Sequence, residues 1–286
     1  MEIICTENSK ELAKNLAKEL SFPIYNANVR RFHNNEISIL LPKRFRNVIV
    51  VASTVKNDDW IELFLLLDAL KESQNLILVM PYMGYGRQDV QNRNESFGLG
   101  LFSRLLDTMR ISNCIICDNH TDPIMRTPVI HHISAAKIFE TDIVNKYDKD
   151  RIVVVSPDVG GVSRASAISR NCRCNFALCN KVRDIFGELK EINVIGNVAG
   201  KICVLIDDII DTGGTLCHAA NSLMQAGGKG VVAYATHGVL SSPQRLEESK
   251  IAEITLTDSI DLKDSPQKFR KLSIVSLIAE AIRYII

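Results

Sequence analysis

Short apolar runs rich in β-branched residues alternate along this chain with amphipathic helical patterns, and this alternation restricts the fold more than any other feature. Each run is apolar over nearly its whole length, as in strands that are buried on both faces of a parallel sheet. The runs expected to form such strands are residues 48–52, 76–80, 114–117, 152–155, 202–206 and 231–235. The main helical patterns between them cover residues 9–20, 60–72, 97–110 and 215–226. The alternation predicts an α/β fold.

The length of the chain favours two domains, because 286 residues are more than one hydrophobic core usually serves. Both halves contain several strand–loop–helix units. The polar stretch 140–151 is the best candidate for a boundary between them. We therefore expect one domain over residues 1–145 and a second over residues 146–286.

Charge and composition exclude several classes of protein. Lys and Arg number 34 against 33 Asp and Glu, and this balance argues against a nucleic-acid binder, which usually carries a basic excess. No run of 18 apolar residues occurs, so we expect no membrane span, and the first residues lack the pattern of a secretory signal. Eight cysteines in so long a chain do not suggest a disulfide framework. We expect reduced thiols and a cytoplasmic protein.

The strongest local signal is the segment 204–215, in which an apolar strand ends in Asp207 and Asp208 and a Thr-Gly-Gly-Thr turn then opens a helix. Backbone N–H groups and two hydroxyls surround the start of that helix, where a phosphate fits. The glycines let the backbone approach an anion closely. The two carboxylates are suited to accept hydrogen bonds from vicinal hydroxyls, as on a ribose.

A second glycine turn follows another apolar strand, in the segment 155–164, with Asp158 and Arg164 close by in the sequence. This arrangement suits pyrophosphate or a magnesium-bound phosphate. An ordinary connection between a strand and a helix is the alternative interpretation.

The segment 204–215 resembles the phosphoribosyl-pyrophosphate-binding signature of phosphoribosyltransferases and of ribose-phosphate diphosphokinases. Segments along almost the whole chain resemble the second family, the phosphoribosyl pyrophosphate synthetases. A phosphoribosyltransferase would carry neither the Arg-Gln-Asp block at residues 87–89 nor a second α/β half. The resemblance implies two phosphoribosyltransferase-like domains, each a mainly parallel sheet flanked by helices. The first would carry the ATP loops and the second the sugar-phosphate loops.

The resemblance also implies roles for particular residues. The ribose hydroxyls would bind Asp207 and Asp208, and the 5′-phosphate would bind Asp211, Thr212, Gly213, Gly214 and Thr215. The ATP site would comprise Phe32, Asn34, Asn35, Glu36, Arg87, Gln88 and Asp89. The pyrophosphate loop would comprise Asp158, Gly160 and Gly161. Mg²⁺ would be held by His120 and Asp158. The transferring diphosphoryl group would be stabilised by Lys181 and Arg183, at the start of the family's catalytic flexible loop. Taken without the family, His120 could be a core histidine, and the two basic residues a solvated pair.

The chain departs from the family pattern in several places. Asn34-Asn35 replaces the usual Asp-Gly, the stretches after Asp89 and His120 are shorter than usual, and the catalytic loop lacks its second arginine. Three interpretations remain open. The first is a synthetase that transfers the diphosphoryl group of ATP to the anomeric hydroxyl of ribose 5-phosphate, giving phosphoribosyl pyrophosphate and AMP. The second is a diphosphokinase acting on a larger 5′-phosphoribosyl acceptor such as ADP-ribose. The third is a non-catalytic regulatory homologue.

The retained segments favour the first interpretation. These are the full signature at Asp207–Thr215 together with His120, Asp158, Lys181 and Arg183. The family builds its ATP site across a dimer and usually assembles further into hexamers, so we expect a homodimer as the minimum unit.

Overall fold

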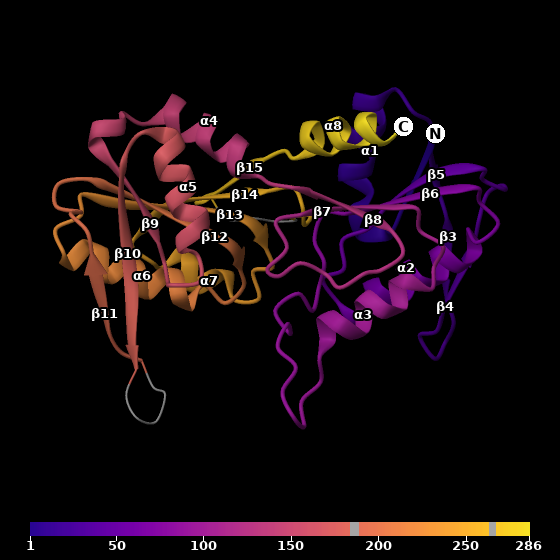
Figure 1. The fold of residues 1–286 in the computed structure, drawn as a ribbon, viewed down its shortest axis with the longest axis horizontal. Helices are drawn as coiled ribbons and strands as arrows, with labels where there is room; N and C mark the ends of the chain where they lie inside the picture. The colour runs from indigo at the N-terminus through magenta and orange to yellow at the C-terminus, as the bar shows by residue number, and fades with distance from the viewer. Residues whose placement is uncertain (184–188, 263–266) are drawn as a thin grey trace. The chain divides into compact units, whose positions relative to one another are not determined.

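A computed structural model describes residues 1–183, 189–262 and 267–286, which form two compact units (Figure 1). The first unit contains Met1–Ser134, Asp258–Asp261 and Ser273–Ile286. The second contains Ala135–Thr257 and, apart from the residues not described, Leu262–Leu272.

This division differs from the expected boundary between residues 145 and 146. Helix α4 (Ala136–Lys146) belongs to the second unit, where Phe139 is buried and its ring lies 5.5 Å from that of Tyr234. The polar composition of residues 140–151 therefore hid a helix with one apolar face. The last helix, α8 (Val275–Ile285), belongs to the first unit, where Arg283 lies 3.1 Å from the carboxylate of Glu19 on helix α1 (Lys10–Leu20).

The first unit is built on a six-stranded, wholly parallel sheet with the strand order β2-β1-β5-β6-β7-β8. Its strands are β1 (Glu2–Cys5), β2 (Ile24–Asn26), β5 (Asn47–Val51), β6 (Asn75–Met80), β7 (Asn113–Cys117) and β8 (Val129–Ile133). Its other helices are the 3-10 turn η1 (Glu7–Ser9), α1 (Lys10–Leu20), α2 (Asn57–Ala69) and α3 (Gly98–Asp107). A separate antiparallel hairpin joins β3 (Asn28–Arg31) to β4 (Ile37–Leu40).

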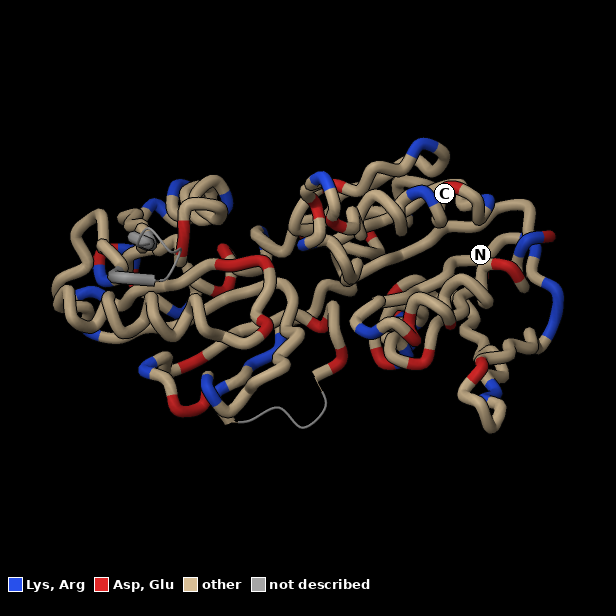
Figure 2. The backbone as a smooth tube through the Cα atoms, turned by 90° about the horizontal axis from the view of Figure 1, so that it is seen from below, with Lys and Arg blue, Asp and Glu red and all other residues tan. Residues whose placement is uncertain are grey.

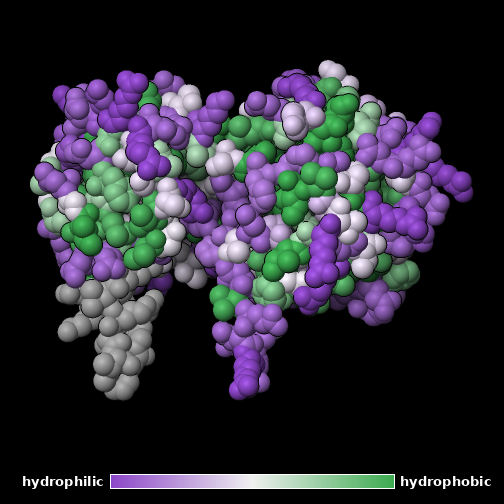
Figure 3. All heavy atoms as spheres, in the orientation of Figure 1, coloured by the Kyte–Doolittle hydropathy of each residue, from purple (hydrophilic) through white to green (hydrophobic). Residues whose placement is uncertain are grey.

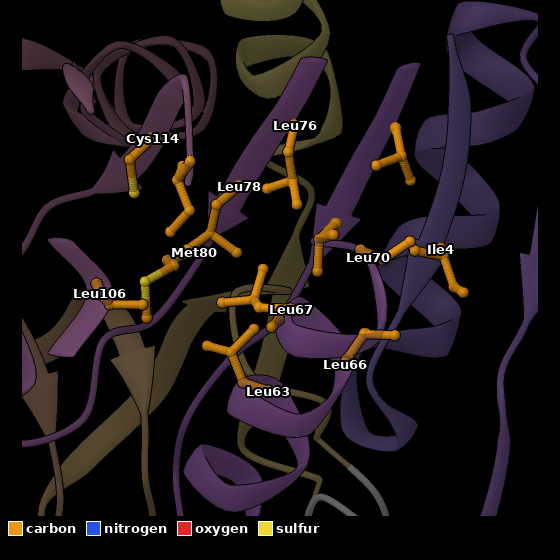
Figure 4. Close-up of a cluster of buried hydrophobic side chains, with 14 of the residues drawn as sticks. Ile4, Leu63, Leu66, Leu67, Leu70, Leu76, Leu78, Met80, Leu106 and Cys114 are labelled. Atoms are coloured by element: carbon orange, nitrogen blue, oxygen red, sulfur yellow. The ribbon is translucent and has the colours of Figure 1, made fainter. Parts of the chain in front are cut away.

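The core of this unit forms where α2 lies on the sheet. Leu63, Leu66 and Leu67 recur at helical spacing and share one cluster with Leu78 and Met80 of β6, toward which Leu63 and Leu67 lie (Figure 4). All five side chains are buried. Complete burial of a leucine contributes about 1.5–3 kcal/mol, so this stripe accounts for the packing of the helix against the sheet.

The second unit is built on a seven-stranded sheet with the order β11-β10-β9-β12-β13-β14-β15. Every neighbouring pair is parallel except β10 and β11. The strands are β9 (Ile152–Ser156), β10 (Asn175–Arg183), β11 (Leu189–Ile195), β12 (Ile202–Ile210), β13 (Gly230–Gly238), β14 (Ile251–Thr257) and β15 (Phe269–Leu272). Its further helices are η2 (Lys149–Arg151), α5 (Val162–Cys172), α6 (Gly214–Gln225) and α7 (Pro243–Glu247).

In each sheet the direction of winding reverses once. The chain passes from β1 to β2 on one side and later adds β5 on the other, and it repeats this pattern with β9, β10 and β12. In open α/β sheets, ligands bind outside the carboxyl ends of the strands at such a switch point. The switch points here lie between β1 and β5 and between β9 and β12.

The expected fold class is confirmed: both units are α/β, with mainly parallel sheets and flanking helices. Acidic and basic residues are interspersed over both units (Figure 2), in line with the net charge of +1. Among the described residues, no helix is long and apolar enough to cross a membrane. All eight cysteines are free, and Cys114 and Cys117 are buried in β7, as expected for structural thiols.

Candidate functional site

The signature segment of the second unit begins where β12 extends beyond its neighbour. The pairing of β9 with β12 ends at Val155 opposite Leu205, whereas β12 continues to Ile210. Asp207 and Asp208 therefore lie at the carboxyl end of the sheet, at the switch point. The glycine turns that follow β9 and β12 open helices α5 and α6 at the same edge.

The acids of these turns interact. Asp208 is only 5% exposed; its Oδ1 accepts the N–H of Ile209 at 3.0 Å, and its Oδ2 lies 3.4 Å from Nη2 of Arg164. Burial raises the pKa of Asp207 well above its usual 3.8, and the neighbouring acids Asp208 and Asp158 raise it further. The carboxylates of the two predicted loops thus lie near enough to influence one another's pKa.

Glycine is required at two positions of these turns. Gly213 adopts φ +73°, and a Cβ there would lie 2.5 Å from Cδ2 of Leu246 on α7. A Cβ on Gly161 would lie 2.9 Å from Oγ of Ser156. Both glycines are buried, and the absence of a side chain lets each turn pack closely against its neighbours. Each turn opens a helix, and the first amide groups of a helix attract anions.

The remaining signature residues occupy the same turns. Gly160 and Asp158 lie in the turn after β9, where Oδ1 of Asp158 accepts the N–H of Gly161 at 3.3 Å. In the turn after β12, the hydroxyl of Thr212 approaches the N–H of Gly214 at 3.5 Å, which is a weak contact. The segment 211–215 follows Ile210 directly and runs into the first turn of α6. The structure therefore brings the predicted sugar-phosphate and pyrophosphate residues together.

Two predicted segments of the first unit also meet, because they follow the neighbouring strands β6 and β7. A Cβ on Gly86 would lie 2.8 Å from Oδ1 of Asn119, and the Thr121 hydroxyl donates to the carboxylate of Asp89. The Arg87-Gln88-Asp89 block and the exposed His120 are thus held in one cluster of loops.

The predicted adenine loop forms the turn of the β3–β4 hairpin. The N–H of Phe32 donates to the carbonyl of Glu36 at 2.9 Å, and Phe32 is 58% exposed. Asn35 adopts φ +67°, a conformation that asparagine tolerates better than most residues other than glycine. The replacement of the family's usual glycine therefore preserves the turn. Oδ1 of Asn34 accepts the N–H of Glu36 at 3.2 Å.

Lys181 and Arg183 lie at the end of β10, where their backbones pair with Ile192 and Leu189 of β11. The pairing register shifts between Val182 and Arg183. Their side chains, and the loop at residues 184–188, lie outside the part of the chain that the structure describes. The predicted catalytic role thus remains a prediction.

Sequence reasoning missed Arg245, which α7 brings to the signature turn. A Cβ on Gly214 would lie 3.1 Å from Nη1 of Arg245. Two residues of the sequence indicate this helix: Pro243 is typical of a first helical position, and Leu246 is an apolar residue that is buried in the structure.

The residues present fit a magnesium ion only in part. Among the described residues, no group of three or more His, Cys, Asp or Glu side chains is placed to hold a metal. Mg²⁺ prefers oxygen ligands and usually keeps several waters, using one or two carboxylates together with substrate phosphates. Asp158 meets that requirement, whereas the imidazole of His120 is a less suitable ligand for so hard a cation.

Comparison with known proteins places the chain in one family. A family model described as the N-terminal domain of ribose phosphate pyrophosphokinase matches residues 1–109, and a phosphoribosyl synthetase-associated domain matches residues 153–286. A ribose-phosphate pyrophosphokinase of Agrobacterium fabrum is 38% identical, with 99% of this chain and 96% of the relative covered. A ribose-phosphate pyrophosphokinase 1 of Listeria monocytogenes is 35% identical over 99% of this chain and 93% of that protein.

A solved structure agrees with the sequence comparison. The crystal structure of phosphoribosylpyrophosphate synthetase from Mycobacterium smegmatis matches with a TM-score of 0.90 and 32% identity, covering 99% of this chain and 98% of that one. This agreement extends over both units. The chain belongs to the ribose-phosphate pyrophosphokinase family.

Proposed function

We propose that the protein transfers the diphosphoryl group of ATP to the anomeric hydroxyl of ribose 5-phosphate, producing phosphoribosyl pyrophosphate and AMP. The observation that carries this proposal is the turn after β12. There Asp207 and Asp208 lie at the sheet's switch point, directly before the glycine turn at residues 211–215. The name of the relatives that match nearly the whole chain supports the same activity.

Ribose 5-phosphate binds at the second unit in this proposal. Its vicinal hydroxyls donate to Asp207 and Asp208, and its 5′-phosphate accepts N–H groups from Asp211–Thr215 at the start of α6. The turn at Asp158, Gly160 and Gly161 receives the diphosphoryl group. Two acids beside an anionic ligand are then explained, because they face hydroxyls rather than phosphate oxygens.

ATP is recognised by the loops of the first unit. The exposed ring of Phe32 offers a stacking surface for adenine, while Asn34, Asn35 and Glu36 provide amide and carboxylate groups beside it. The block Arg87-Gln88-Asp89 supplies a guanidinium, an amide and a carboxylate. Asp158 and His120 are each proposed as ligands of Mg²⁺, which when bound neutralises negative charge on the phosphates.

The chemical step depends mainly on positioning and charge stabilisation. The anomeric oxygen forms a bond to the β-phosphorus of ATP and loses its proton, the bond from that phosphorus to the α-phosphate bridging oxygen breaks, and AMP departs. Lys181 and Arg183 supply positive charge to the diphosphoryl group as it transfers.

We also propose that the protein acts as a homodimer or as a larger assembly such as a hexamer. Exposed apolar side chains support this: on α2 Ile61 is 51% exposed, and on α3 Leu101 is 47% exposed. Figure 3 shows hydrophobic side chains at the surface of the first unit, to which α2 and α3 belong. Light scattering of an active sample tests the assembly, and a fully active monomer would contradict it.

We propose a cytoplasmic location as well. The eight free cysteines suit a reducing cytoplasm.

Release of AMP from ATP tests the activity, with ribose 5-phosphate and ADP-ribose compared as acceptors. We expect release with ribose 5-phosphate. Release only with ADP-ribose would instead assign the protein to a larger acceptor. No release with either acceptor, at several magnesium concentrations, would indicate a non-catalytic homologue.

A further inference from the structure

The signature segment lacks positive charge of its own. Residues 207–215 contain three aspartates and neither lysine nor arginine. The proposed function nevertheless places a phosphate dianion at this segment. The dipole of α6 offers the equivalent of only about half a positive charge at its N-terminus. A cation from elsewhere in the fold would add the charge that the amide groups of the turn do not supply.

Two arginines approach the segment, and they differ in what they contact. Arg164 lies 3.4 Å from Asp208, so its charge is committed to a carboxylate. Arg245 lies at the other end, with Nη1 3.1 Å from the place of a Cβ on Gly214. Within the described part of the chain, no carboxylate forms an ion pair with Arg245. Its guanidinium is available to an anion at the N-terminus of α6.

Helix α7 holds Arg245 at this position. Leu246, the next residue, is fully buried and occupies the space that a side chain at Gly213 would need. The carbonyl of Arg245 also lies 3.6 Å from Sγ of Cys217 on α6. The absence of side chains at Gly213 and Gly214 therefore lets α7 pack directly on the signature turn. Arg245 itself remains exposed.

Building on the proposed function, we propose that Arg245 binds the 5′-phosphate of the sugar substrate and so selects phosphorylated over unphosphorylated pentose. A guanidinium presents two parallel N–H groups that match phosphate oxygens, and such charge-assisted bonds are stronger than neutral ones. Asp207 and Asp208 recognise hydroxyls that ribose and ribose 5-phosphate share. Arg245 recognises the group that distinguishes them.

Three variants of the full chain test this: Arg245→Gln, Arg245→Lys and, as a matched control, Lys250→Gln, which removes an exposed charge from the same segment. Calorimetry with ribose 5-phosphate and steady-state kinetics are the measurements. We expect Arg245→Gln to weaken binding of ribose 5-phosphate about 10- to 100-fold, the usual effect of losing a charged hydrogen bond. The KM for ATP and the melting temperature should not change. Arg245→Lys should recover part of the loss, and Lys250→Gln should match the wild type.

Equal affinity of Arg245→Gln and the wild type for ribose 5-phosphate would overturn the assignment. So would an equal rise in the KM for ATP, because that pattern indicates general damage to the fold. A wild type that binds ribose 5-phosphate but never releases AMP would contradict the proposed function alone, since the binding comparison still tests Arg245. A wild type that does not bind ribose 5-phosphate would overturn both.

Discussion

The two units share one winding pattern but treat their switch points differently. In the first unit, the protein's own side chains bridge the loops that follow β1 and β5. Nδ2 of Asn8 donates to the carbonyl of Ser53 at 2.5 Å, and Oγ of Ser9 accepts the N–H of Ser53 at 2.9 Å. In the second unit, glycines occupy the equivalent turns, and Gly160 and Thr212 of these turns are exposed.

Internal carboxylates complete this contrast. Asp59 accepts the N–H groups of Val55 and Lys56 at 2.8 and 2.6 Å at the start of α2, and the buried Glu62 accepts the N–H of Glu7 at 2.7 Å. These side chains accept amide groups near the start of α2, whereas the amide of Gly214 at the start of α6 makes only the weak contact with the Thr212 hydroxyl. The comparison indicates how one architecture could serve two purposes under the proposed function: polar side chains bridge one switch point and stabilise the fold, and the glycine turns at the other receive the substrate.

The largest expected effect concerns the chemistry at the second unit. Lys181→Ala should lower kcat about 10²–10³-fold, because a charge that meets the diphosphoryl group near the transition state contributes about 3–4 kcal/mol to the rate. The affinities for ATP and ribose 5-phosphate should change little. Steady-state kinetics with both substrates varied is the measurement. Normal turnover with only a raised KM for ATP would show that Lys181 is a binding residue.

The second largest effect should come from adding a side chain to the signature turn. In Gly213→Ala, an alanine must adopt φ +73° and its Cβ must displace Leu246. We expect a loss of about 2–3 kcal/mol in the free energy of unfolding, from backbone strain and overpacking together. Gly200→Ala is the control: Gly200 has φ +70° but no atom within 4 Å of its Cβ position. Chemical denaturation should show that this control loses about 1–2 kcal/mol in the free energy of unfolding, which is the backbone strain alone. Equal losses in Gly213→Ala and Gly200→Ala would show that the contact with Leu246 adds no cost.

The pH dependence of stability should distinguish the carboxylates of the two units. Burial raises the pKa of both Asp207 and Glu62 above their usual values of 3.8 and 4.5. In the folded protein each therefore holds its proton to higher pH than in the unfolded chain. The stability that each protonated carboxyl contributes is complete at a pH below its pKa in the unfolded chain. It falls as the pH rises toward the raised pKa in the folded protein, with a slope of at most about 1.4 kcal/mol per pH unit for each group.

Asp207→Asn and Glu62→Gln should both flatten this dependence and stabilise the ligand-free protein at pH 7, measured by denaturation across pH 4–8. Their effects on function should differ. Asp207→Asn should raise the KM for ribose 5-phosphate, because a hydroxyl acceptor is lost, whereas Glu62→Gln should leave it unchanged. A raised KM in Glu62→Gln would show that the switch point of the first unit also serves the substrate site.

The second unit was the easier of the two to predict from the sequence. Its signature turn must contain glycine, since Gly213 is in the left-handed region, and its acids directly follow a strand. Predicted strands such as 202–206 and 231–235 were confirmed, although β12 and β13 extend to Ile210 and Gly238. The extensions were missed because apolar periodicity ends at the acids of β12 while backbone pairing continues.

The first unit was harder to predict, because its features depend on contacts between distant segments. Asn8 and Glu11 stand at the spacing of an N-terminal capping box, but Ser9 is the N-cap of the first helix and no side-chain cap bond forms there. Asn8 bonds across the switch point to Ser53 instead. The return of α8 to this unit was missed for the same reason: its apolar face indicates burial but not the partner.

The smallest expected effect sharpens the account of the first unit. Asp59→Ala leaves the N–H groups of Val55 and Lys56 without their carboxylate acceptor and should cost about 1 kcal/mol of unfolding free energy, as for other helix N-terminal caps. The neighbouring Asp58 is the matched control, because it contributes only an exposed ion pair, with its Oδ2 3.0 Å from Nη1 of Arg31. Asp58→Ala should cost at most about 0.5 kcal/mol, as exposed pairs usually do. Urea denaturation of both variants measures the difference.

Because Asp59 lies at the switch point of a unit that binds no sugar phosphate in this proposal, the KM for ribose 5-phosphate should stay at the wild-type value in both variants. Equal costs for the two variants would show that the carboxylate of Asp59 is an ordinary surface acid, and that polar side chains bridge the loops after β1 and β5 without it.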